Sequence, residues 1–209
     1  MSITSPDQVF TLLPVVQPPR REILARLGYR AAKTQLSHDD EQTISANMAE
    51  AFELCVFTSY YRRIAVTKRS GATLTLENGA QIVSDSFNEF TGGYSSLLVM
   101  AASAGIAVCT AIAELSAQQK MGKAVIYDAL ASECADAALD WTQRYCTQQF
   151  KRSGELVSSK RFSPGYGDLD IQTQRIFFDL LALDKRGFTL TSSSLLIPEK
   201  SVIGIAAIA

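Results

Sequence analysis

The residues best suited to chemistry gather in one short segment, which reads Arg161-Phe162-Ser163-Pro164-Gly165-Tyr166-Gly167-Asp168. Arg161 offers a planar fork of donors that suits a carboxylate, and Tyr166 offers a flat ring with a polar tip. Gly165 and Gly167 permit unusual backbone angles and the close approach of another molecule, while Pro164 fixes its own φ. The segment could hold a small anionic or zwitterionic ligand. An ordinary turn with a surface arginine is the alternative that spacing alone leaves open.

The cysteines and the single histidine do not predict a metal site. Cys55, Cys109, Cys134 and Cys146 are widely spaced and form no CxxC pair, whereas structural zinc needs closely spaced ligands. His38 lies in an acidic stretch typical of a helix start, where we expect it to be solvated. We expect Cys134 to pack as a small apolar residue.

Signatures of other catalytic sites are weak. The glycine spacing after Arg161 matches neither the dinucleotide-binding GxGxxG pattern nor a phosphate loop. A hydrolase would have to combine Ser193 or Ser194 with His38, and the sequence has no nucleophile elbow and no oriented acid to support it.

Length and charge bound the class of protein. The 209 residues, of which 47% are apolar and 20% charged, predict one domain over residues 1–209 with a sizeable core. Residues 1–35 are expected to be an extended and helical segment that packs on this domain. The net charge of −1 provides no basic excess for nucleic acid or for a membrane surface. Met1–Gln8 lacks a signal-peptide pattern, so we expect reduced thiols and a cytoplasmic location.

One uncharged stretch, Leu97–Ala113, approaches the length of a membrane-spanning helix. Its Ala-Ala-Ser-Ala-Gly centre carries little transfer free energy, and neither basic flanks nor an aromatic belt accompany it. We therefore predict a buried strand over Ser96–Met100 that turns into a helix at Ser103-Ala104-Gly105, and no membrane span.

Hydrophobic spacing predicts the elements that position the segment after Arg161. Helices are expected over Arg20–Leu27, from about Ser37, over about Gly122–Phe150 and over about Leu169–Leu183. Trp141 and Tyr145 are expected in the buried stripe of the third helix. Asp168 is expected to cap the fourth helix. Strands are expected over Tyr60–Thr67, Ala72–Leu76, Ala80–Val83, Phe188–Thr191 and Ser201–Ile208. Asn78-Gly79 predicts a tight hairpin. Because strands and helices segregate, the sequence predicts an α+β fold with a largely antiparallel twisted sheet and flanking helices.

Taken in order, the motifs resemble the activation domain of cobalamin-dependent methionine synthase. That domain carries R-x-x-x-G-Y, then a helix, then LTES and a P-x-x-S-V-x-G strand. Here the matching residues are Arg161-x-Ser163-Pro164-Gly165-Tyr166, Leu190-Thr191-x-Ser193 and Pro198-x-x-Ser201-Val202-x-Gly204. Leu98–Gly105 looks like that domain's strand and small-residue turn, and Lys123–Ala131 looks like the start of its long helix. The resemblance covers roughly Ala80 to Ile208.

The resemblance implies a fold and a function. In that family the domain binds S-adenosylmethionine in a shallow groove and presents its methyl group to cobalamin on another module. An electron from a flavodoxin-type donor and this methyl group restore cobalamin that has oxidised to the cobalt(II) state. Because this chain contains no cobalamin-binding or folate-binding module, it looks like a free-standing relative that acts in trans. The implied partner is a methionine synthase lacking its own activation domain, or a related corrinoid methyltransferase, so the chain would be one component of a methyltransferase.

Carried over by position, the resemblance assigns the ligand contacts. Arg161 would pair with the ligand carboxylate, Ser163 would contact the ligand through its backbone, and Tyr166 would lie near the reactive end. Pro164 and Gly165 would shape the loop. No catalytic acid, base or metal ligand is expected from this chain, since the reduced cobalt is itself the nucleophile.

One departure from the family's pattern motivates an alternative. Ser192 stands where the family's LTES motif has glutamate. A relative that kept the fold but lost the ligand would be a non-catalytic scaffold for a corrinoid protein.

Overall fold

The structure is a computed structural model that describes residues 8–30 and 35–209. Within the N-terminal part, β1 (Phe10–Leu12) pairs with β2 (Thr58–Ser70), and α1 (Arg20–Arg26) buries Ile23 completely. The expectation for residues 1–35 is thus described only in part. Residues 1–7, which make up nearly all of the segment considered for a signal peptide, lie outside the described residues.

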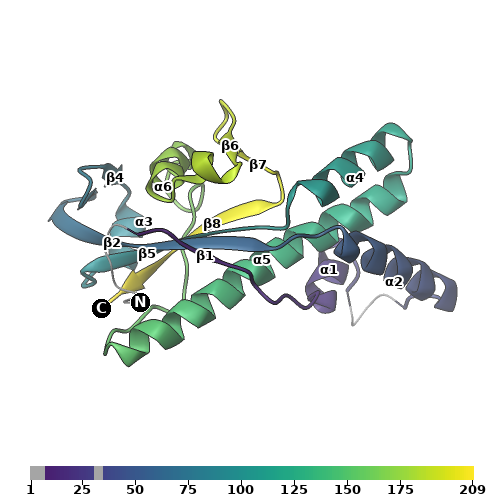
Figure 1. Cartoon of the computed structure of the whole chain (residues 1–209), viewed down its shortest axis with the longest axis horizontal. Helices are drawn as coiled ribbons and strands as arrows, with labels where there is room; N and C mark the ends of the chain where they lie inside the picture. The colour runs from purple at the N-terminus through teal and green to yellow at the C-terminus, as the bar shows by residue number, and fades with distance from the viewer. Residues whose placement is uncertain (1–7, 31–34) are drawn as a thin grey trace.

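A six-stranded antiparallel sheet forms the centre of the molecule (Figure 1). Its path is β4-β3-β2-β5-β8, with β1 pairing to β2 beside it. The strands not yet bounded are β3 (Thr73–Leu76), β4 (Gln81–Val83), β5 (Ser96–Ser103) and β8 (Ser201–Ile208). Every pairing is antiparallel, which confirms the predicted α+β class.

Helices cover both faces of the central strands. The long helix α5 (Met121–Arg152) lies along one face, and α6 (Gln174–Leu180) lies on the other (Figure 1). The helices α2 (His38–Glu53) and α4 (Ile106–Ala117) pack against the first part of α5 and extend the molecule beyond the sheet.

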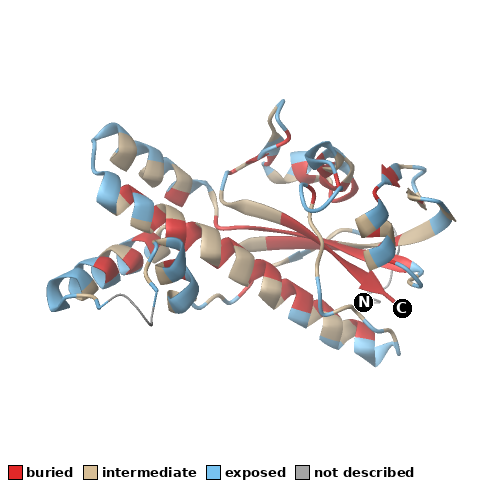
Figure 2. Cartoon of the chain, turned by 180° about the vertical axis from the view of Figure 1, so that it is seen from behind, coloured by how far each residue is buried: buried red, intermediate tan, exposed pale blue. Residues whose placement is uncertain are grey.

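This double covering explains the uncharged run in the sequence. All eight residues of β5 are buried, and Figure 2 shows the central strands as an almost continuous buried layer. Alternate side chains of β5 point to opposite faces, as the period of two requires: Leu97 and Val99 pack in the core under α6, whereas Leu98 and Met100 pack under α5. Among the described residues no helix has the length and apolar character that a membrane crossing needs.

Two elements near the chemistry differ from the prediction. The helix expected over Leu169–Leu183 is divided into η1 (Ile171–Thr173), α6 and η2 (Leu183–Arg186), with the left-handed backbone of Ala182 before η2. Asp170, not Asp168, accepts the bond from the first turn, at Gln172 N. The strand expected over Phe188–Thr191 is reduced to β6 (Thr189–Leu190), which pairs with β7 (Leu196–Ile197) in a separate small sheet.

The buried stripe of α5 also differs from the prediction. Trp141 and Tyr145 are half-buried and stack on one another with ring centroids 5.6 Å apart. The fully buried positions of this part of the helix are Thr142 and Cys146, which directly follow the predicted Trp141 and Tyr145. A further short helix, α3 (Asp85–Phe90), was not predicted.

Candidate functional site

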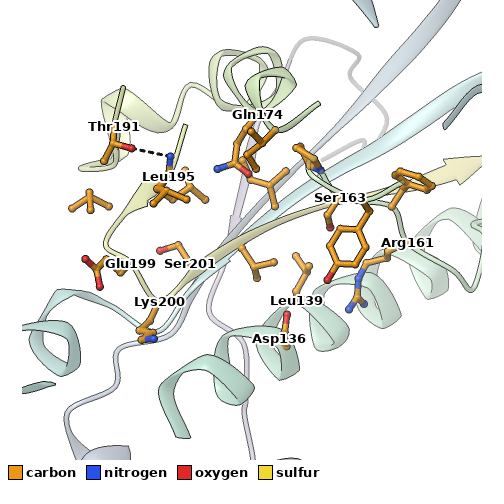
Figure 3. Close-up of a pocket in the computed structure, with 18 residues that line it drawn as sticks. Asp136, Leu139, Arg161, Ser163, Gln174, Thr191, Leu195, Glu199, Lys200 and Ser201 are labelled. Atoms are coloured by element: carbon orange, nitrogen blue, oxygen red, sulfur yellow. Dashed lines mark hydrogen bonds between the residues drawn. The ribbon is translucent and has the colours of Figure 1, made fainter. Parts of the chain in front are cut away.

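A groove of about 830 Å³ lies between α5, the segment after Arg161, and the strands β7 and β8 (Figure 3). Arg161, Ser163, Asp136 and Leu139 lie toward one end, and Thr191, Glu199 and Lys200 lie toward the other. The walls are therefore mixed: apolar side chains form much of the floor, and charged groups stand at both ends. Such a groove suits a ligand with an apolar middle and a charged terminus.

Backbone bonds hold the segment after Arg161 beside the sheet. Phe162 and Ile205 of β8 exchange two N–H···O bonds of 2.8 Å, which fixes the residue after Arg161. Gly165 donates its N–H to Leu169 O at 2.8 Å and has a φ of 89°. This left-handed backbone favours glycine, and a Cβ at Gly165 would lie 3.3 Å from Ile171 Cδ1, a close contact that a small shift of the isoleucine side chain would relieve.

Asp168 ties the far side of this segment to α3. Its carboxylate accepts from Ser84 Oγ at 2.5 Å, from the Asp85 N–H at 2.7 Å, and from both the N–H and the hydroxyl of Ser86. These bonds, led by the two hydroxyls, hold the pKa of Asp168 well below its ordinary range. The prediction that Asp168 caps the following helix was wrong, because a more distant helix N-terminus offers it more donors.

The Arg161 side chain crosses Gly204 of β8 and ends against α5. A Cβ at Gly204 would lie 3.1 Å from Arg161 Cδ and 2.8 Å from Leu139 Cδ2. Arg161 Nη1 donates to Asp140 Oδ1 at 2.5 Å and to Gln143 Oε1 at 2.8 Å. Among the described residues no acceptor engages the opposite edge, formed by Nε and Nη2. The side chain is 24% exposed and lines the groove.

Asp136 is the groove residue that reasoning from the sequence missed. It lies one helical turn before Asp140 on α5 and lines the groove. Burial, together with the charge of Glu133, raises its pKa above the ordinary value, and Arg161 partly opposes that shift. The helical spacing of Asp136, Asp140 and Gln143 was the available signal, since positions four and seven residues apart share a face.

The other predicted ligand residues are placed as follows. Ser163, Pro164 and Tyr166 line the groove together with Arg161, and Tyr166 is 69% exposed. Gly165 shapes the turn and is not part of the lining. Ser192, the departure from the family's motif, is exposed and lies outside the groove lining.

The structure gives no support to a hydrolase. His38 begins α2, while the turn that holds Ser193 and Ser194 lies at a distant edge of the molecule between β6 and β7 (Figure 1). Burial raises the pKa of the Cys55 and Cys134 thiols to about 12, which leaves them protonated and unreactive at neutral pH. The described residues include no group of three or more His, Cys, Asp or Glu side chains that could hold a metal ion.

Comparison with solved structures supports the fold, whereas comparison with known sequences finds no match. No family model matches the chain, and no curated protein sequence matches it. Among solved structures, the chain is similar to the crystal structure of the MetH reactivation domain bound to AdoHcy, with a TM-score of 0.66 and 14% sequence identity. The match covers 96% of this chain and 78% of that one. At this identity the likeness concerns the fold, and the chain has the fold of the MetH reactivation domain.

Proposed function

We propose that this chain binds S-adenosylmethionine in the groove and supports the reductive remethylation of cobalamin on a separate cobalamin-dependent methyltransferase. The observation that carries the proposal is that Arg161, whose Nε–Nη2 edge has no acceptor among the described residues, lines a groove together with Asp136 and Tyr166. The fold that presents this groove is also the fold of a domain crystallised with AdoHcy.

Arg161 would bind the carboxylate of the ligand's amino-acid part. Two parallel N–H donors on one edge of a guanidinium match the two oxygens of a carboxylate, and charge-assisted pairs of this kind are the stronger hydrogen bonds. Because Gly204 leaves room for the arginine stem, the Arg161 side chain can lie across β8 and line the groove.

Asp136 and Tyr166 would favour the positive charges of S-adenosylmethionine. The Asp136 carboxylate lines the same end of the groove as Arg161, where it can attract an ammonium or a sulfonium group. The exposed ring of Tyr166 offers a π-face to a cation within about 6 Å of its centre.

The chain's own contribution to the reaction would be orientation. After reduction by one electron from a flavodoxin-type donor, the partner's cobalamin would supply the nucleophile for the methyl group of S-adenosylmethionine, and S-adenosylhomocysteine would be the leaving group. Arg161 and Asp136 would hold the donor in the groove, and the exposure of Tyr166 leaves the groove accessible to a second protein.

A remethylation assay in trans tests the function. A methionine synthase fragment without its activation domain, with cobalamin in the cobalt(II) state, is mixed with a reductant and methyl-labelled S-adenosylmethionine. The label should reach the corrinoid protein only when this chain is added, and Arg161→Ala should abolish most of the transfer. Arg144→Ala is the matched control, because Arg144 is an arginine of α5 that lies outside the groove lining. Equal transfer with and without the chain would contradict the proposal.

The scaffold alternative is distinguished by the same materials. The departure at Ser192 motivated it, and this residue lies outside the groove lining. A scaffold would bind the corrinoid protein in a pull-down while equilibrium dialysis detects no retained S-adenosylmethionine.

A further inference from the structure

We infer that Gln143 is a positioning residue, which sets the plane of the Arg161 guanidinium so that its Nε–Nη2 edge receives the ligand carboxylate. The inference rests on the proposed function, and it assigns a ligand-recognition role to a residue that does not line the groove.

The amide of Gln143 has a defined orientation. The side chain is buried, with 7% of its surface exposed. Its Nε2 donates to Ser158 O at 2.7 Å, so its Oε1 is the atom that accepts from Arg161 Nη1 at 2.8 Å. A flipped amide would place a donor against the guanidinium and an acceptor against a carbonyl, and would lose both bonds.

Gln143 is in turn anchored to the sheet. Ser158 donates its N–H to Ala207 O at 2.8 Å and accepts the Ala207 N–H on its hydroxyl at 3.0 Å. Ala207 belongs to β8, the strand whose Gly204 lies under the arginine stem. The guanidinium is therefore held at both ends by one strand: its stem rests on Gly204, and its Nη1 is tied through Gln143 and Ser158 to Ala207.

Asp140 contacts the same nitrogen and cannot replace Gln143 in this role. Its side chain is 49% exposed, so it is free to change rotamer, and its charge competes with the ligand carboxylate for Arg161. Gln143 is a neutral acceptor, so it orients the guanidinium without neutralising it. Because a guanidinium is planar, fixing its stem and one terminal nitrogen fixes the direction of the remaining edge.

The test separates carboxylate recognition from general damage by using two ligands. S-adenosylhomocysteine carries the amino-acid carboxylate, and 5′-methylthioadenosine lacks the whole amino-acid part. Calorimetric titration of Gln143→Leu should show affinity for S-adenosylhomocysteine reduced about tenfold, as expected when a hydrogen bond that orients a charged group is lost. Affinity for 5′-methylthioadenosine should stay within about twofold of wild type, since that ligand makes no contact with Arg161.

Three further variants complete the design. Gln148→Leu is the matched control, because Gln148 is an exposed residue of the same helix and should leave both affinities unchanged. In an Arg161→Ala background, Gln143→Leu should have no further effect on S-adenosylhomocysteine, because the residue acts through the arginine. Gln143→Met, which keeps the length of the side chain, serves if the leucine variant does not fold.

Each outcome decides the inference. Equal losses for the two ligands would show a merely structural role and overturn it, as would an unchanged affinity for S-adenosylhomocysteine. Wild-type protein that binds neither ligand would contradict the proposed function itself, and the inference would fall with it.

Discussion

The two sides of the groove are built in opposite ways. At the Arg161 side, a charged group is fixed by buried contacts to β8 and α5, including Gln143 at 7% exposure. At the outer rim, Tyr166 and Leu195 expose 69% and 57% of their surface. One side is prearranged before any ligand arrives, and the other offers apolar surface to whatever approaches from solvent.

This difference matches two separate tasks. A fixed guanidinium edge costs little to order when a carboxylate binds, so it favours affinity and specificity. The exposed rim is suited to contact with a second protein, because exposed apolar surface beside a site commonly marks an interaction surface. The variants below break one side and spare the other.

Among the variants that keep Arg161, Gly204→Ala should have the largest effect, because it disturbs the packing beneath the arginine side chain. The new Cβ would lie 2.8 Å from Leu139 Cδ2 and 3.1 Å from Arg161 Cδ. We expect the free energy of unfolding to fall by about 1–3 kcal/mol, and the arginine to be displaced from its stem position. Affinity for S-adenosylhomocysteine should fall about tenfold, because the displaced Arg161 would no longer be oriented to make its charged hydrogen bonds with the ligand carboxylate. Gly122→Ala is the control, because a Cβ at Gly122 meets nothing within 4 Å. Equal changes in the free energy of unfolding and in affinity for the two variants would contradict the expected clash at Gly204.

Asp136→Asn should have the next largest effect and should change the pH dependence of binding. Burial raises the pKa of Asp136, so its negative charge is lost on acidification at a higher pH than for an ordinary aspartate. Wild-type affinity for cationic S-adenosylmethionine should therefore fall as the pH is lowered through that raised pKa. The asparagine variant should bind about fivefold more weakly at neutral pH, as for an ion pair worth about 1 kcal/mol, and should show no such fall. Parallel pH profiles of the two proteins, measured by calorimetry, would exclude Asp136 from the site.

Tyr166→Ala tests the exposed rim. Because the ring is 69% exposed, its removal should leave the thermal midpoint unchanged. Affinity for S-adenosylmethionine should fall about two- to fivefold, as expected for an exposed cation–π contact of about 0.5–1 kcal/mol. Tyr166→Phe should retain wild-type affinity. A strongly lowered thermal midpoint in the alanine variant would show that the rim is part of the packed structure.

Asp168→Asn should have the smallest effect on binding and a measurable effect on stability. The folded-state pKa of Asp168 is depressed by the hydroxyls of Ser84 and Ser86, so its stabilising contribution is present above the unfolded-state pKa, near 3.8. It is lost as the pH falls through the folded-state value. The thermal midpoint of the variant should thus lie below that of wild type at neutral pH, and the two should converge in acid. Asp170→Asn is a control outside this cluster, and a difference independent of pH would contradict the assignment.

The fold was largely predictable from local patterns. The uncharged run at Leu97–Ala113 predicted a buried strand followed by a helix, and Gly105 marks the turn with a φ of 90°. The Asn78-Gly79 pair predicted the β3–β4 hairpin. Both patterns are local in the sequence, so these elements could be predicted without knowing which other parts of the chain pack against them.

The site was predictable only where its residues are close together in the sequence. Arg161, Ser163, Pro164 and Tyr166 are close in sequence, and the structure brings all four to one groove. Asp136 and Gln143 were missed because they come near Arg161 only when α5 packs against β8. Asp168 was misassigned for the same reason: a local cap was predicted, and α3, which is 82 residues away at Ser86, supplied better donors.

The most direct test of the central claim is calorimetric titration with S-adenosylmethionine of wild-type protein, Arg161→Ala and Arg144→Ala. We expect saturable one-to-one binding to wild type and to Arg144→Ala, and affinity about 10- to 100-fold weaker for Arg161→Ala, the range expected when a charged hydrogen bond is removed. Wild-type affinity retained by Arg161→Ala would contradict the assigned site. No binding by the wild-type protein at millimolar ligand would contradict the claim that the groove is an S-adenosylmethionine site.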